Sequence, residues 1–201
     1  MKPTEILSHE HRIIEQVLAC LERMMQKSAS EGRLDPQPAR DAVAFFRNFA
    51  DRCHHGKEEA HLFPAMEAKG FSPDCGPTSV MRREHELGRM HVRQMASAID
   101  AAAAGDAEAL RRFVENAQGY VELLREHIQK EDHCLFAMAN QALSEGDQRR
   151  LSAAFEKVEA EEMGAGTHET YVKIADDLAE QYGVPRTGTA AAAHEACGCG
   201  H

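Results

Sequence analysis

The chain contains no tryptophan and only three tyrosines among its 201 residues. Aromatic side chains are enriched in strands, so their scarcity in an alanine-rich sequence favours helices over sheets. No run of about 18 apolar residues is present, which argues against a membrane-spanning helix. Basic residues are also few: 23 lysines and arginines stand against 33 acidic residues, for a net charge of −10. Proteins that coat nucleic acids neutralise phosphates with lysine and arginine, so we expect neither nucleic acid nor membrane as a partner.

No apolar segment follows Met1 to Glu5, so the sequence shows no signal peptide and predicts a cytoplasmic protein. In that compartment the six cysteines are expected to be reduced thiols rather than a disulfide framework. Histidine, by contrast, is abundant. Twelve histidines in an acidic chain call for a chemical explanation.

Capping residues, prolines and glycines divide the chain into six predicted helices. Thr4 is the expected N-cap of the first helix, and Pro64 predicts a kink or an early end in the second. No segment alternates with the period of a strand. Four long helices are predicted, and they cover roughly residues 4–27, 38–70, 78–104 and 106–143. Two shorter ones are expected near residues 147–164 and 167–183.

This pattern predicts an all-α fold, an up-down-up-down four-helix bundle with one or two extra C-terminal helices and a flexible tail. The bundle is expected over residues 1–145, and the additional helices, packed on the bundle, over 146–183. Residues 184–201 are rich in proline, glycine, threonine and alanine and are predicted to form a disordered tail with cysteine and histidine.

The bundle is also an internal repeat. Residues 54–59 and 127–132 both read His-x-x-Lys-Glu followed by an acid, and a Leu-Phe pair comes soon after each. The separation from His54 to His127 nearly equals those from His11 to His85 and from Glu58 to Glu131. Matching separations of metal-ligating residue types indicate two copies of a helical hairpin.

Residues four apart on a helix point the same way, so His54 with Glu58 and His127 with Glu131 can each clasp an ion. His54 and His55 are adjacent, so only one of them is expected to face the core of the bundle. The residues on the same helix face as His55 are polar, which predicts a surface position for His55, so His54 is chosen as the ligand. The candidates lie on apolar stripes with one histidine on each bundle helix. The predicted metal site therefore consists of His11, His54, Glu58, His85, His127 and Glu131.

Two carboxylates on buried faces cost several kcal/mol each unless cations compensate them. Imidazole and carboxylate ligands without thiolate suit iron, manganese or zinc. Six ligands divided over two ions leave open coordination positions, which favours a redox-active di-iron site over structural zinc. A ferritin-like site is rejected, because Glu-x-x-His occurs only at Glu58–His61 and Lys130 stands where the second glutamate belongs.

Two further features stay open at this stage. Tyr120 lies two turns before His127 on the same stripe, where it is either a core residue or a group that approaches the metals. In the tail, Cys197, Cys199 and His201 form a possible second metal site for Cu(I), zinc or nickel; the alternative is incidental thiols in a disordered segment.

At its histidine motifs the sequence resembles the hemerythrin family, specifically the bacterial HHE cation-binding domains. The matching motifs are Glu10-His11, His54-x-x-x-Glu58-Glu59 with Leu62-Phe63-Pro64, Glu84-His85-Glu86-Leu87-Gly88-Arg89, and His127-x-x-x-Glu131 with Leu135-Phe136. The resemblance covers roughly residues 4–143. It implies a four-helix bundle around two iron ions per chain, bridged by an oxo or hydroxo group, that binds or reacts with O₂, NO or peroxide.

The chain departs from the oxygen-carrying members at two positions. Arg89 stands where they have a second histidine on the third helix, and Glu131 stands where they have an aspartate. The set looks more like the bacterial di-iron proteins that answer nitrosative stress. The resemblance therefore implies a role in oxidative or nitrosative stress response or in protecting iron centres. The alternative is a non-enzymatic module that handles metal or senses O₂ or NO.

Overall fold

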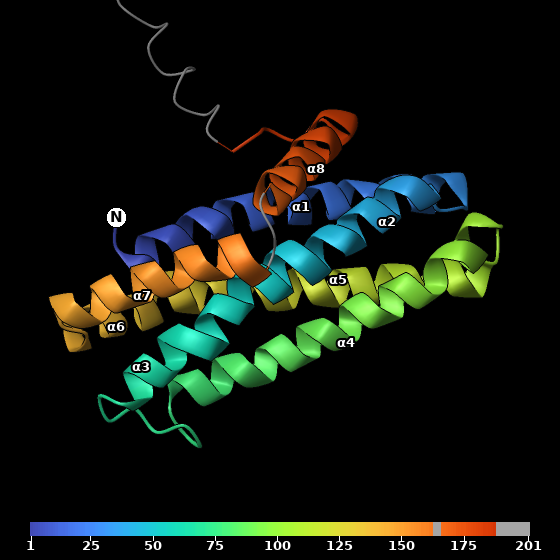
Figure 1. Cartoon of the computed structure of the whole chain (residues 1–201). Helices are drawn as coiled ribbons and strands as arrows, with labels where there is room; N and C mark the ends of the chain where they lie inside the picture. The colour runs from blue at the N-terminus through green and yellow to red at the C-terminus, as the bar shows by residue number, and fades with distance from the viewer. Residues whose placement is uncertain (163–165, 188–201) are drawn as a thin grey trace, which may run out of the picture.

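The computed structural model describes residues 1–162 and 166–187, and these residues form helices and connecting turns without any strand. The longer helices follow one another as four rods, which lie side by side in Figure 1. The first is α1 (Pro3–Glu31) and the third is α4 (Pro77–Ala103). The second passes through α2 (Pro36–Phe45), η1 (Phe46–His55), η2 (Glu58–Leu62) and α3 (Phe63–Glu67). The fourth consists of α5 (Ala107–Lys130), η3 (Glu131–Leu135) and α6 (Phe136–Ala142).

Short turns between the rods reverse the chain each time, so neighbouring rods are antiparallel. The fourth rod packs on both the first and the third, since α5 contacts α1 and α4, while α2 packs on α4. This arrangement confirms the predicted all-α four-helix bundle. The predicted N-cap of the first helix was wrong. Lys2, not Thr4, is the N-cap of α1, and Thr4 is buried with its hydroxyl hydrogen-bonded to the Asn140 side chain.

The apolar core is divided in two along the bundle. One cluster includes Ile13, Phe49 and Val92, and the other includes Leu7, Phe63 and Met81. Between them every rod contributes buried polar side chains. A polar layer enclosed by two apolar clusters is costly unless its groups are paired or bind ions, so this layer is where chemistry is expected.

Three stretches of π-helix lie in this middle region, η1 and η2 in the second rod and η3 in the fourth. A π-helix forms hydrogen bonds from i to i+5 and so has a wider turn than an α-helix. Such stretches are rare and occur often at functional sites, because they turn side chains in directions that a regular helix does not allow.

The C-terminal residues add a second layer on one side of the bundle (Figure 1). α7 (Glu145–Lys157), capped by Ser144 with Asp147, contacts α1 and η2 and is continued by η4 (Val158–Glu162). α8 (Thr167–Tyr182) packs on α1 and α2. Beyond it, the Thr187 backbone donates a hydrogen bond to the Gln16 side chain.

The predicted metal-binding tail with Cys197, Cys199 and His201 lies outside the described residues. Within the described part, no helix combines the length and the apolarity needed to cross a bilayer.

Candidate metal centre

Five histidines and two glutamates converge in the polar layer from all four rods. α1 contributes His11, α4 contributes His85, and α5 contributes His127. The π-helical stretches contribute the rest, which are His54, His55, Glu58 and Glu131. All seven are buried, with at most 4% of any of them exposed.

Their side-chain atoms form two groups, each compact enough to hold one ion because its ligand atoms all lie within 4.8 Å of one another. The first group consists of His11, His54, Glu58 and Glu131. The second consists of His55, Glu58, His85 and His127. Glu58 belongs to both.

The two glutamates each face both groups, with one carboxylate oxygen toward either side. Glu58 Oε1 lies 3.7 Å from His54 Nε2, and its Oε2 lies 3.4 Å from His85 Nε2. Glu131 Oε2 lies 3.2 Å from His11 Nε2, and its Oε1 lies 3.3 Å from His127 Nε2. These positions suit carboxylates that bridge two cations.

The inward-facing atoms fit metal ions better than they fit each other. Both oxygens of Glu58 and of Glu131, and Nε2 of His11, His54 and His55, are buried without a hydrogen bond to any described residue. An unsatisfied buried polar group costs about 1–3 kcal/mol, and a charged one costs more. Divalent cations would compensate all of these atoms at once, and a nitrogen and oxygen donor set without thiolate suits iron.

In each of the five histidines of the two groups, Nδ1 points away from the centre of the site and faces a carboxylate. Nδ1 lies 2.6–2.9 Å from a carboxylate oxygen in four cases: Asp132 for His11, Glu10 for His54, Glu59 for His85 and Glu84 for His127. For His55 the distance to Asp51 is 3.5 Å. A carboxylate that accepts the Nδ1 proton leaves the Nε2 lone pair directed into the site, as metal-binding histidines require.

Each of these outer carboxylates is in turn paired with a cation. Lys57 bonds Glu10, Arg12 bonds Asp132, and Lys130 bonds Glu84. Arg89 bonds both Asp51 and Glu59. The net charge around the site is thereby reduced at its outer edge, while the histidines keep their orienting acceptors.

The same supports recur in the two halves of the repeat. Glu10 follows the pattern of Glu84: each stands beside a histidine in the sequence but bonds the histidine of another rod. In both Glu-His motifs the glutamate therefore forms a hydrogen bond between rods and orients a histidine on the neighbouring rod.

Burial and neighbouring charge drive the site's pKa values apart. Burial and the charge of Glu131 raise the pKa of Glu58 well above its usual range. Burial also opposes ionisation of Glu131, but His127 and His11 outweigh it and hold its pKa low. Burial lowers the pKa of His54 to about 4, against the opposing effect of Glu10. Without cations, the two carboxylates thus differ sharply in their affinity for a proton.

The structure brings all six predicted ligands into the two groups, but the surface position expected for His55 is wrong. His55 is buried, and its ring stacks on that of His85 with centroids 3.8 Å apart. The cause is η1, whose wider turn brings two consecutive residues, His54 and His55, into the bundle. The sequence signal for His55 is Asp51, since it stands one helical turn before His55 and faces its ring.

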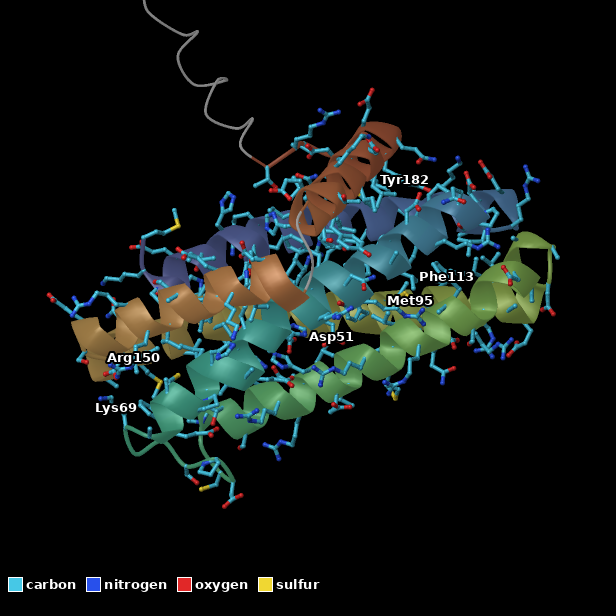
Figure 2. All side chains as sticks on the ribbon, viewed as in Figure 1. Asp51, Lys69, Met95, Phe113, Arg150 and Tyr182 are labelled. Carbon is cyan, nitrogen blue, oxygen red and sulfur yellow. The ribbon has the colours of Figure 1, made fainter. Side chains whose placement is uncertain are left out.

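Two other candidates lie outside both groups. His61 is half-buried against Phe155, with ring centroids 6.4 Å apart. Tyr120 is a buried residue that packs edge-to-face on Phe46. Its ring also forms part of a cavity of about 220 Å³ beside His55 and His85. Asp51, which lines the same cavity, is labelled in Figure 2 near the middle of the bundle.

Comparison with known proteins agrees with this geometry. The family model of the Hemerythrin HHE cation binding domain matches residues 2–139. The chain is 25% identical over 181 residues to uncharacterized proteins of Mycobacterium bovis and of two strains of Mycobacterium tuberculosis. Each alignment covers 90% of this chain and 70% of the relative. No solved structure matches the chain significantly.

Proposed function

Because the chain belongs to the hemerythrin family of HHE cation-binding domains, we propose that it holds two iron ions and binds or reacts with O₂, NO or peroxide. The observation that carries this proposal is the convergence of five histidine side chains and two glutamates in one buried layer. Each glutamate carboxylate has one oxygen toward each of the two groups. Two adjacent iron ions supply reversible electron transfer and open coordination positions for a small ligand.

The two groups differ in how many protein ligands they offer. Glu58 and Glu131 serve both, but the first group adds two histidines and the second adds three. The group with fewer protein donors keeps more room for an exogenous ligand. We therefore assign the small ligand to the ion held by His11 and His54.

The surroundings of that group suit a small ligand of low polarity. The His11 ring stacks on Phe136 with centroids 5.5 Å apart, and Leu7 is buried in the same apolar cluster. Asp132 and Glu10 hold the outward nitrogens of the two histidines, so the rings stay fixed while a ligand enters or leaves. A buried candidate iron site with apolar neighbours suits a role in oxidative or nitrosative stress.

The test is metal analysis of the full-length chain from iron-replete cells, followed by rapid mixing with O₂, NO and H₂O₂ in separate experiments. We expect about two iron ions per chain, near-ultraviolet charge-transfer absorption, and a spectral change with at least one of the three ligands. His61→Ala serves as the matched control, because His61 lies outside both groups and its loss should change nothing.

Two outcomes would contradict the proposal. A metal-free or zinc-only protein removes the di-iron assignment. Iron that responds to none of the three ligands removes the ligand assignment and supports the alternative, a module that handles metal without turning over a small molecule.

A further inference from the structure

The cavity beside His55 and His85 is too large for a diatomic ligand alone. Its volume is about 220 Å³, whereas a cavity of about 150 Å³ is enough to hold benzene. It lies against the group with three histidines, not the group to which the small ligand is assigned above. A second molecule, with several carbon atoms, would fit this space.

The walls of the cavity are largely apolar. Phe46 and Tyr120, which pack on each other, present aromatic rings, and Val92 is a buried member of the same apolar cluster. Gly88 lies beside Tyr120: a Cβ at this position would sit 3.3 Å from the Tyr120 ring, so a larger residue would push into this wall. These walls would receive a flat or slender hydrocarbon body.

The solvent-exposed edge of the cavity is cationic. Arg47 from η1 and Arg93 from α4 both line it, and both are exposed. Across residues 1–162 and 166–187 neither guanidinium forms an ion pair, although acidic residues outnumber basic ones in the chain as a whole. Arg89, by contrast, lines the same cavity but is engaged by Asp51, Glu59 and Glu86.

We propose that this cavity binds a small organic carboxylate, with the carboxylate at Arg47 and Arg93 and the hydrocarbon body against the wall that Phe46, Val92 and Tyr120 form. Guanidinium groups recognise carboxylates by paired hydrogen bonds, and two free ones at one opening select an anion over a neutral molecule. The far end of the ligand faces His55 and His85, next to the metal centre. The proposal does not rest on the proposed function, because every group it uses belongs to the protein.

The experiment is calorimetric titration of benzoate into the full-length, metal-loaded protein at low ionic strength. Benzyl alcohol serves as the neutral probe of the same shape. We compare the wild type with the double variant R47Q/R93Q and with R23Q, which removes an exposed arginine on α1 that does not line the cavity. All three replaced arginines are exposed, so the variants should fold, and circular dichroism checks this.

We expect benzoate to bind the wild type and R23Q equally, and R47Q/R93Q at least about tenfold more weakly, since the charge-assisted hydrogen bonds to the carboxylate are lost. Benzyl alcohol should bind more weakly than benzoate. A Val92→Phe variant, which fills the cavity, should lose benzoate binding while keeping its metal content.

The inference is overturned if benzoate does not bind the wild type, if R47Q/R93Q binds it as well as R23Q does, or if benzyl alcohol binds as tightly as benzoate. Metal content is measured on the same samples. Benzoate binding by a protein that contains no iron would contradict the proposed function and leave this inference intact.

Discussion

The imidazole rings of His55 and His85 stack nearly parallel, with an interplanar angle of 13° and centroids 3.8 Å apart. Two stacked rings from different rods place both Nε2 atoms at one group, so we count His55 among the candidate ligands although the polar residues on its helix face predicted a surface position. We predict that His55→Ala lowers the metal content from about two ions per chain to about one, because the second group loses a donor while the first is intact.

Elemental analysis of the purified variant checks this prediction. His91→Ala is the matched control, since His91 is a half-buried histidine of α4 that bonds Asn116 and belongs to neither group. Unchanged metal content in the His55 variant would return His55 to a purely structural role.

The periodicity of the sequence is most dependable for candidate ligands in regular helices. His11, His85 and His127 stand in α-helices, where a rotation of about 100° per residue separates buried from exposed positions correctly. His55 stands in η1, where the turn is wider and the same rule fails. A π-helix departs from the rotation that the periodicity rule assumes, so the rule alone cannot place His55, and only the Asp51 carboxylate four residues earlier indicates its position.

The outer carboxylates could not be assigned for a related reason. Glu59 is next to Glu58 in sequence but bonds His85, and Asp132 is next to Glu131 but bonds His11. Helical spacing describes one rod at a time, whereas these bonds join two rods. Their partners depend on the rotation and height of each rod in the bundle, which only the tertiary structure sets.

Glu58 and Glu59 are adjacent, yet they should differ greatly on substitution. Glu58→Gln removes a charge shared by both groups, so we predict loss of both ions. Glu59→Gln only weakens the support of His85, and loss of such an outer partner typically reduces metal affinity by about 10- to 100-fold. Competition with a chelator measures both affinities.

Glu86→Gln is the control for the second of these variants, because Glu86 bonds Arg89 but no histidine in the described part of the chain. If Glu59→Gln retained wild-type affinity, the bond to His85 Nδ1 would have no role in binding. If it lost both ions, Glu59 would be a ligand itself.

Acid should destabilise the metal-free chain through His54. Burial holds the pKa of His54 at about 4 in the folded state, below the 6.5 of an exposed histidine. The unfolded chain therefore binds an extra proton between these values, and stability present above pH 6.5 is lost as the pH falls toward 4. A shift of this size corresponds to roughly 3 kcal/mol.

Chemical denaturation of the chelated protein from pH 7 to pH 4 measures this loss. His54→Ala should show a flatter dependence over that range, with the difference concentrated below pH 6.5. Parallel curves for the wild type and the variant would show that His54 is not the group that titrates.

Lys57 and Lys130 hold equivalent places in the two halves of the repeat, yet their burial differs completely. Lys57 is fully buried between Glu10 and Glu159, whereas the Lys130 side chain beside Glu84 is 42% exposed. Removing one partner of a buried pair leaves an uncompensated charge and costs about 3–5 kcal/mol, so Lys57→Met should be strongly destabilising. Lys130→Met should cost about 1 kcal/mol or less, because exposed pairs contribute little.

Denaturant unfolding of the two metal-loaded variants compares their free energies of unfolding directly. Equal losses in the free energy of unfolding would mean that Lys57 is not needed to compensate the buried charge of Glu10. They would also mean that the ion pair of Lys57 with Glu159 of η4 does not add to stability.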